Sequence, residues 1–351
     1  MSIESIKKAL LKKRSDKTQP TKDFVSSGLT LLNLSLTGRT KTGLAKGCYY
    51  LFVGDSRAGK TFLALNVLAE VANNPEFDSY RLIYNAPEGG ARMNMAKFFG
   101  EKMAKRLELK KSFFLEEFYY DLDDMTKEGT PYIAVLDSMD SLIPKEEADK
   151  FDEKKAAFRK CKEISGSYGT GKAKENSAYL RVAVNNLARN GSILIIISQT
   201  RDNIGFGSQF NPKTRSGGKA LRYYATGEVL FSIKGAIKKT VRGKPRKIGS
   251  LLQMKVEKNR DTGREPVIEV AHYPDIGFDD TGSMIDFLVE EGTWKQNKTG
   301  YIESPWGSLR MDALVAKIEG GNLEKELRTI VAGTWKEIEE ACEVKRKVRY
   351  S

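Results

Sequence analysis

The sequence predicts an α/β fold in which a doubly wound, mostly parallel sheet is extended by antiparallel strands. Four short and nearly continuous apolar runs occupy residues 48–54, 81–86, 132–137 and 192–198. Runs of this kind are typical of parallel strands that are buried on both faces, and helical patterns separate them. After residue 225, strand-like runs alternate with basic or glycine-containing turns, which is typical of antiparallel pairing. In such sheets, ligands bind at the carboxyl ends of the parallel strands.

Both ends of the chain have helical patterns. Residues 3–14 place Ile3, Ile6, Leu10 and Leu11 on one side and lysines on the other, which predicts a short amphipathic helix. A polar stretch with Pro20 follows and is expected to be a linker. Near the other end, residues 311–344 predict two helices separated at Gly320–Gly321, and these are expected to form a small C-terminal appendage.

The composition excludes several classes of protein. The chain has 351 residues, of which 40% are hydrophobic and 30% charged, as in a globular protein. His272 is the single histidine, which excludes Ser-His triads and histidine-rich metal sites. Cys48, Cys161 and Cys342 lie far apart, so neither a disulfide framework nor a zinc cluster is expected. The sequence has neither a signal-peptide pattern nor an apolar run that could cross a bilayer, so we expect a cytoplasmic protein without membrane contact.

The formal net charge of +13 favours a polyanionic partner. Nucleic acid is the first candidate, and a charge that serves only solubility is the alternative.

Residues 54–61 match the phosphate-binding pattern GxxxxGK[ST]. They follow the apolar run YYLFVG and open a helical pattern, which is the context that this motif requires. Backbone amides of such a loop surround phosphate oxygens, Lys60 neutralises the outer phosphates and the Thr61 hydroxyl holds Mg²⁺. The sequence therefore predicts ATP and Mg²⁺ as cofactors, bound by Gly54, Asp55, Ser56, Arg57, Ala58, Gly59, Lys60 and Thr61.

Three more polar residues follow predicted strands and are expected at the same sheet edge. Asp137 ends one strand and is a second candidate Mg²⁺ contact. Glu88 follows another strand and could polarise the water that attacks the γ-phosphate. Gln199 ends the fourth strand and could sense that phosphate. The alternatives are a plain strand-ending acid for Asp137 and an ordinary loop residue for Gln199.

Four segments together resemble the RecA family of strand-exchange recombinases. They are VSSGLTLLNLSLTG (25–38), VLDSMDSLIPKEE (135–147), the run from Ile197 to Thr226 with its GG-x-AL-x-[FY]-YA element, and KVEKNRDTG (255–263). The resemblance covers about residues 24–295 and favours a phage-type member. The sequence departs from bacterial RecA at PEGG (87–90) and at Asn85, where an acid is common, and its C-terminus is basic rather than acidic.

The resemblance implies a DNA-dependent ATPase that forms helical filaments on single-stranded DNA and promotes homologous pairing and strand exchange with duplex DNA. It implies that Lys258 and Arg260 reach the ATP of a neighbouring subunit and act with Lys60, Glu88 and Gln199 in catalysis. It divides the chain into an N-terminal helix and linker (1–23), a RecA-like ATPase core with DNA-binding loops (24–296) and a small C-terminal region (297–351). Single-strand-binding and loader proteins are possible partners, and a phage-encoded member would act in the cytoplasm of a bacterial host.

Two segments match the DNA-binding loops of that family. The second loop is glycine-rich and cationic, with apolar side chains that could separate bases; its candidate contacts are Arg201, Asn203, Ile204, Gly205, Phe206, Phe210, Lys213, Arg215, Gly217, Gly218 and Lys219. The first loop is expected as a flexible segment over residues 165–181, with Lys172, Lys174 and Arg181 as candidate phosphate contacts. A solvated loop is the alternative for both segments.

The acid-free segment 233–247 contains seven cations and is interpreted either as a hairpin that captures duplex DNA or as a solvated turn. Tyr223 and Tyr224 lie in an apolar context and are expected in the core.

Two other functions stay open. A ring-shaped DNA motor could use the same ATPase core, although the GG-x-AL element favours recombination. A regulatory DNA-binding protein could use ATP only as an assembly switch, and Asn85 leaves that possibility open.

Overall fold

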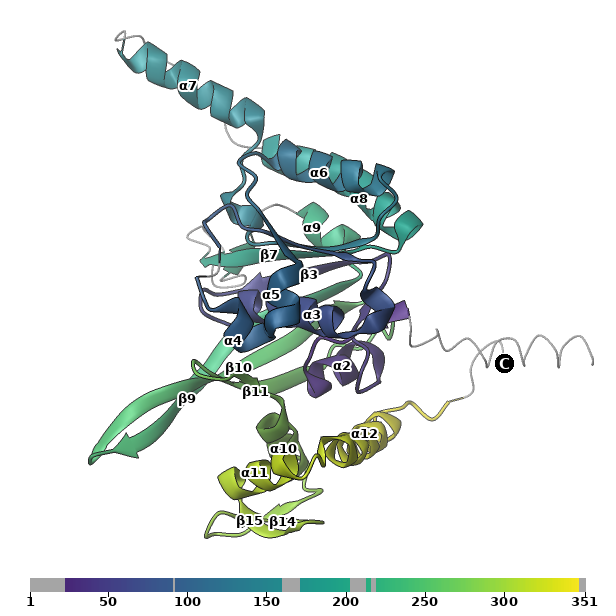
Figure 1. The fold of residues 1–351 in the computed structure, drawn as a ribbon, viewed down its shortest axis with the longest axis vertical. Coiled ribbons are helices and arrows are strands. Elements are labelled where there is room, and N and C mark those ends of the chain that lie inside the picture. The colour runs from purple at the N-terminus through teal and green to yellow at the C-terminus, as the bar shows by residue number, and fades with distance from the viewer. Residues whose placement is uncertain (1–22, 91, 160–170, 203–212, 216–218, 347–351) are drawn as a thin grey trace, which may run out of the picture.

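The computed structural model describes residues 23–90, 92–159, 171–202, 213–215 and 219–346. Within these residues, one large sheet has the strand order β12-β11-β10-β9-β3-β7-β6-β4-β5, with β8 paired to β7 (Figure 1). The strands are β3 (Tyr49–Gly54), β4 (Arg81–Asn85), β5 (Leu107–Lys110), β6 (Tyr132–Leu136), β7 (Ile193–Asp202), β8 (Lys213–Arg215), β9 (Gly227–Val241), β10 (Lys244–Asn259), β11 (Val267–Tyr273) and β12 (Gly277–Asp279). A separate pair joins β1 (Phe24–Val25) to β2 (Leu44–Ala45).

The strands from β9 to β5 run parallel, whereas β10, β11 and β12 are antiparallel additions. This arrangement confirms the predicted fold class and the predicted extension of the sheet. Strand β3 lies at its centre between β7 and β9, with Gly54 level with Gln199 on one side and with Phe231 on the other. The register therefore brings the predicted phosphate loop and Gln199 to the same edge.

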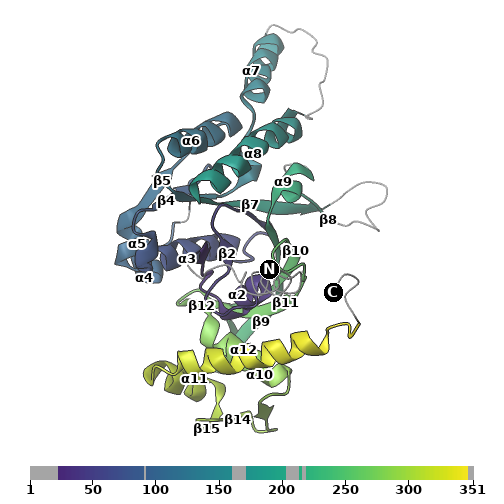
Figure 2. The ribbon, with the colours of Figure 1, turned by 90° about the vertical axis from the view of Figure 1, so that its right-hand side faces the viewer.

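Helices cover both faces of the parallel strands, as a doubly wound sheet requires (Figures 1 and 2). On one face, Leu63 and Val67 of α3 pack with Phe52 and Ile195 in one apolar cluster. On the other, Leu180 and Leu187 of α8 pack with residues of α6 and with Leu194 in a second cluster. The helices of this core are α2 (Thr30–Thr37), α3 (Lys60–Asn73), α4 (Met95–Phe99), α5 (Glu101–Arg106), α6 (Leu115–Lys127), α7 (Lys145–Arg159), α8 (Gly171–Asn190) and α9 (Lys219–Tyr224), with short 3-10 turns η2 (Pro75–Phe77) and η3 (Met139–Ser141).

Strands β9 and β10 form a long hairpin that projects from the body of the molecule (Figure 1). Its tip is the two-residue turn Arg242–Gly243, in which both φ angles are positive, 53° and 73°. Such turns match the twist of a hairpin, and glycine favours the second position. Residues 233–247 thus form the outer part of a hairpin, and their cationic side chains are exposed.

Helix α10 (Asp280–Glu290) follows the sheet, and the C-terminal region contains α11 (Met311–Gly320) and α12 (Glu324–Ala341). The predicted pair of helices separated at Gly320–Gly321 is confirmed. A three-stranded sheet that the sequence did not predict precedes them, formed by β13 (Lys295–Gln296), β14 (Tyr301–Ser304) and β15 (Gly307–Arg310). Trp335 of α12 packs against Phe287 of α10, and Figure 2 shows α12 alongside α10.

Two expectations are wrong. Residues 171–181 belong to helix α8 and not to a flexible segment, because Asn176 and Leu180 are buried and fix its first turns. Tyr223 is 68% exposed rather than part of the core, because α9 ends there on the surface.

The predicted N-terminal helix, residues 3–14, lies outside the described residues. Within the described part of the chain, no helix has the length and apolar character needed to span a membrane.

Candidate nucleotide and DNA site

The phosphate loop connects the end of β3 to the first residue of α3. Lys60 is 6% exposed, and its Nζ donates hydrogen bonds to the carbonyl oxygens of Gly54 at 2.7 Å and Asp55 at 2.6 Å. Burial lowers the pKa of Lys60, while the nearby carboxylates of Asp137, Asp55 and Asp140 oppose that shift. The amides of the first turn of α3 face the loop, so the loop combines backbone donors with a lysine cation.

Neighbouring strands fix the conformation of this loop. A Cβ at Gly54 would lie 2.2 Å from the carbonyl oxygen of Phe231 on β9. Gly59 has φ 86°, and a Cβ there would lie 2.8 Å from Cδ1 of Leu252 on β10. Only glycine fits at these two positions, because backbone and core atoms occupy the space that a side chain needs.

Two oxygen donors for a cation meet beside the loop. The Thr61 hydroxyl donates to Asp137 Oδ2 at 2.6 Å, and the Tyr84 hydroxyl donates to the same oxygen at 2.8 Å. One hydroxyl and one carboxylate suit Mg²⁺, which completes its octahedral shell with phosphate oxygens and water. The described residues contain no cluster of three or more acidic, cysteine or histidine ligands, so this pair fits a phosphate-bound metal rather than an all-protein metal cage.

Glu88 lies in the turn after β4, next to the residues that follow β6. Its Oε1 accepts a hydrogen bond from Ser138 Oγ at 3.2 Å and another from the Ser141 hydroxyl. Asn85 takes no part in this contact, because it is buried and exchanges hydrogen bonds with Ser112 at 2.7 and 3.1 Å. The carboxylate of Glu88 is therefore held at the same sheet edge as Asp137.

Strand β7 joins this edge to the start of the second predicted DNA loop. The backbone amide of Gln199 donates to Asp140 Oδ2 at 2.8 Å, and the hydroxyl of Thr200 donates to Asp55 in the phosphate loop. From Thr200 onward, β7 pairs with β8 in antiparallel register, with Thr200 opposite Arg215 and Asp202 opposite Lys213.

Lys258 and Arg260 lie at the end of β10. Lys258 Nζ donates to the carbonyl oxygens of Arg222 and Tyr223 at 2.7 and 2.9 Å, and Arg260 Nη2 donates to that of Tyr223 at 2.6 Å. Burial, followed by the charge of Arg260, lowers the pKa of Lys258 from its ordinary value of 10.5 to about 8. Both cations therefore sit at the exposed end of α9, beside the buried carboxylate of Glu228, which pairs with Arg222 at 3.1 Å.

If the charge of Lys258 contributes to activity, the ATPase rate should fall between pH 7 and pH 9. The pKa of Lys258 lies below its ordinary value, so the cation is lost as the pH rises through about 8. In the Lys258→Arg variant, the guanidinium stays charged over this range, so the part of the fall that is due to residue 258 should disappear. Parallel profiles for the two proteins would contradict the prediction.

The other DNA-binding candidates fall into three groups. In the first group, which lies on α8, Lys172 Nζ donates to the carbonyl oxygens of Met139 and Asp140 at 2.9 and 3.3 Å. Arg181 Nε donates to the Tyr224 hydroxyl at 3.3 Å, and Lys174 is exposed. For the second loop, the structure gives the backbone of Arg201 in β7, of Lys213 and Arg215 in β8, and of Lys219 at the start of α9. The remaining candidates lie outside the described residues: Asn203, Ile204, Gly205, Phe206, Phe210, Gly217 and Gly218.

The sequence did not single out Tyr84, Asp140, Ser141 or Thr200, which contact the predicted site residues. The spacing of Asp137, Asp140 and Ser141 within one short segment was the available signal. The short turn after β6 brings both acids close enough to Lys60 for each carboxylate to act on the pKa of that lysine.

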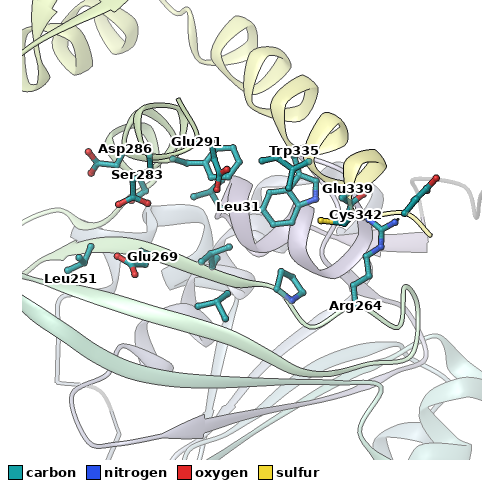
Figure 3. Close-up of a pocket in the computed structure, with 17 residues that line it drawn as sticks. Leu31, Leu251, Arg264, Glu269, Ser283, Asp286, Glu291, Trp335, Glu339 and Cys342 are labelled. Atoms are coloured by element: carbon teal, nitrogen blue, oxygen red, sulfur yellow. Dashed lines mark ion pairs between the residues drawn. The ribbon is translucent and has the colours of Figure 1, made fainter. Parts of the chain in front are cut away.

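A separate groove of about 720 Å³ lies between β11, α10 and α12 (Figure 3). Leu31 and Trp335 contribute apolar surface, and its rim carries Glu269, Glu291 and Glu339. Burial, reinforced by Glu290 and Asp279, raises the pKa of Asp286 in this groove to about 6. Carboxylates repel a triphosphate, so the phosphate loop is the better candidate for nucleotide.

The chain is similar in sequence to known proteins of one family. A family model described as the RecA N-terminal domain matches residues 3–272. The chain is 27% identical over 304 residues to Protein RecA of Nostoc punctiforme, a match that covers 82% of this chain and 73% of that protein. It is 28% identical over 279 residues to Protein RecA of Lactococcus lactis subsp. cremoris, a match that covers 78% of this chain and 65% of that protein. It is 26% identical over 318 residues to Protein RecA of Acidothermus cellulolyticus, a match that covers 84% of this chain and 78% of that protein. These matches therefore span about two thirds to three quarters of the relatives' length.

Proposed function

Because this chain belongs to the RecA family, we propose that it is an ATP-dependent recombinase that forms filaments on single-stranded DNA and promotes homologous pairing and strand exchange. The observation that carries the proposal is strand β7. It holds Gln199 level with Gly54 of the predicted phosphate loop and continues to Asp202, at the start of the second candidate DNA loop. Nucleotide and DNA segments that share one strand can act on each other.

ATP hydrolysis is assigned to the edge formed by β3, β4 and β6. The loop amides and Lys60 bind the phosphates, and Thr61 and Asp137 hold Mg²⁺. The metal, when bound, neutralises charge that develops on the phosphoryl oxygens. Glu88 orients the attacking water and accepts its proton, and the two serine hydroxyls keep its carboxylate in place.

Assembly is assigned to the end of β10. Lys258 and Arg260 present cations at an exposed position, where the triphosphate of a neighbouring subunit is their partner in the proposal. ATP then bridges two subunits, and its hydrolysis weakens the filament. This function is placed in residues 24–296, with residues 1–23 and 297–351 as smaller additions. Single-strand-binding and loader proteins are proposed partners.

DNA binding is assigned to the two candidate loops and to the projecting hairpin, which we propose captures duplex DNA. Its outer part presents Lys234, Lys238, Lys239, Arg242, Lys244, Arg246 and Lys247 without an acidic residue. Lys234 pairs with Glu269 of β11, so the cations nearer the tip are the better phosphate contacts. Exposed cations on a projecting arm bind a phosphate backbone without reading sequence.

Replacing Lys238, Lys239 and Arg242 with alanine should weaken duplex binding at low salt. Each phosphate contact releases counterions, so the slope of log affinity against log salt should flatten by about 2 to 3. The slope is measured by fluorescence anisotropy at several salt concentrations. Replacing Lys102, Lys105 and Lys325 removes the same charge from other surfaces and should leave the slope unchanged. Equal slopes for the two triple variants would show that the hairpin does not contact DNA phosphates.

The recombinase proposal is tested with single-stranded DNA and a slowly hydrolysed ATP analogue. With the analogue we expect helical filaments in electron micrographs. In a parallel assay with ATP itself, we expect hydrolysis that rises in proportion to the single-stranded DNA added. Closed six-membered rings would instead indicate a DNA motor. DNA binding and assembly without strand exchange would indicate a regulatory protein. A nucleotide-loaded chain that stays monomeric and does not bind unpaired DNA would refute the proposal.

A further inference from the structure

The short turn η3, residues 139–141, contacts three separate parts of the candidate site. Ser141 donates its hydroxyl to Glu88 after β4. Asp140 accepts from the backbone amide of Gln199 at 2.8 Å. The carbonyl oxygens of Met139 and Asp140 accept from Lys172 Nζ at 2.9 and 3.3 Å. The turn therefore links the candidate water-activating acid to β7 and to the first turn of α8.

The two carboxylate oxygens of Asp140 differ in their hydrogen bonding. Its Oδ2 bonds to Gln199, whereas its Oδ1 is buried and has no hydrogen-bond partner among the described residues. A neutral acceptor would satisfy the Gln199 amide equally well, and a buried carboxylate oxygen without a donor is costly. The carboxylate also acts on Lys60, since it opposes the lowering of that lysine's pKa. Asp140 is thus electrostatically part of the phosphate site.

We propose that Asp140 is a positioning residue that fixes Gln199 at the phosphate site, and that the 139–141 turn couples ATP binding to both DNA-facing segments. This inference rests on the proposed function and adds the element through which nucleotide and DNA communicate. Strand β7 continues from Gln199 to Asp202, next to residues 203–212, and α8 begins at Gly171, directly after residues 160–170. A displacement of the turn therefore acts on the ends of both segments.

The physical cause of the coupling is charge. Interactions between charges in a partly buried site are screened less than those on the surface. A triphosphate at Lys60 changes the field at the Asp140 carboxylate, and that carboxylate holds the Gln199 amide. Substitution of Asp140 should therefore change how strongly ATP affects DNA binding.

The test measures the affinity of the full-length chain for fluorescent single-stranded DNA, with and without a slowly hydrolysed ATP analogue. The ratio of the two dissociation constants is the coupling, which typically lies between about 5-fold and 150-fold. For the unmodified chain we expect a ratio in this range, and for Asp140→Ala a ratio near one. Asp140→Asn keeps an acceptor for Gln199 without the charge, so its ratio should fall between those two. Asp124→Ala, an exposed aspartate on α6, should match the unmodified chain.

A purely structural role for Asp140 would lower the melting temperature and weaken both affinities together, leaving the ratio unchanged. An unmodified ratio in Asp140→Ala, or in Asp140→Asn if the alanine variant does not fold, overturns the inference. A ratio of one in the unmodified chain would instead contradict the proposed function on which it rests. Lys172→Ala tests the coupling between the turn and α8. If Lys172 holds the turn, the ratio should fall in this variant. An equal loss of both affinities would show that Lys172 only contacts DNA phosphates, and would contradict coupling through α8.

Discussion

Replacing Glu88 with glutamine should slow ATP turnover by about 10²- to 10⁴-fold, the range that a general base contributes. A glutamine amide cannot accept a proton from the attacking water. Its carbonyl oxygen can still accept the hydrogen bonds that Ser138 and Ser141 now donate, so the shape of the site should be kept. ATP binding should change little, because Lys60 and the loop amides remain in place.

The measurement is a single-turnover hydrolysis rate with single-stranded DNA present, together with a titration of a fluorescent ATP analogue. Glu101→Gln, in the exposed first turn of α5, makes the same chemical change away from the site and should hydrolyse ATP at the unmodified rate. Unchanged hydrolysis in Glu88→Gln would show that another group activates the water.

Replacing Lys60 with alanine should remove nucleotide binding at micromolar concentrations of ATP, and hydrolysis with it. Hydrogen bonds to charged groups contribute about 1.5–3 kcal/mol, which corresponds to an affinity lower by about 10- to 200-fold. The loss of turnover should be larger still, because the ammonium also neutralises charge that develops on the outer phosphates. Arginine is not expected to restore activity, since its wider guanidinium does not fit where Lys60 is 6% exposed.

Isothermal titration with ATP and Mg²⁺ measures this effect, and a melting curve shows whether the variant is folded. Lys102→Ala on α5 removes a half-exposed cation and should bind ATP as the unmodified chain does. Unaltered ATP affinity in a folded Lys60→Ala protein would contradict the assignment of residues 54–61 as the phosphate site.

The central sheet was predictable because its strands are buried on both faces. Such strands read as continuous apolar runs, and β3, β4, β6 and β7 begin or end within a few residues of the predicted runs. Residues 54–61 were equally visible, since every group of a phosphate loop lies in one short stretch of sequence. Buried strands and the phosphate loop could therefore be predicted from the sequence, because the residues that define each of them are adjacent in the chain.

Elements with weaker local signals escaped prediction. Strand β5 is an edge strand of sequence LELK, whose charged positions resemble a helix surface as much as a strand. The strands β13 to β15 are two to four residues long and mostly polar. The start of α8 depends on tertiary packing, because GKAKEN has no apolar residue large enough to mark a helix face. Asp140 escaped for another reason: its partner Gln199 is 59 residues away, and only the folded sheet brings the two together.

The close contact between Gly54 and Phe231 has a mechanical consequence. A Cβ at position 54 would meet the carbonyl oxygen of Phe231 at 2.2 Å, so β3 and β9 leave no clearance at the start of the phosphate loop. The outer part of the projecting hairpin, residues 233–247, begins on the same strand β9. Strand β3 pairs with Gly227–Phe231 of β9, so sliding between the paired residues would disturb this contact, and the register of the two strands should stay fixed beside the phosphate loop during nucleotide turnover.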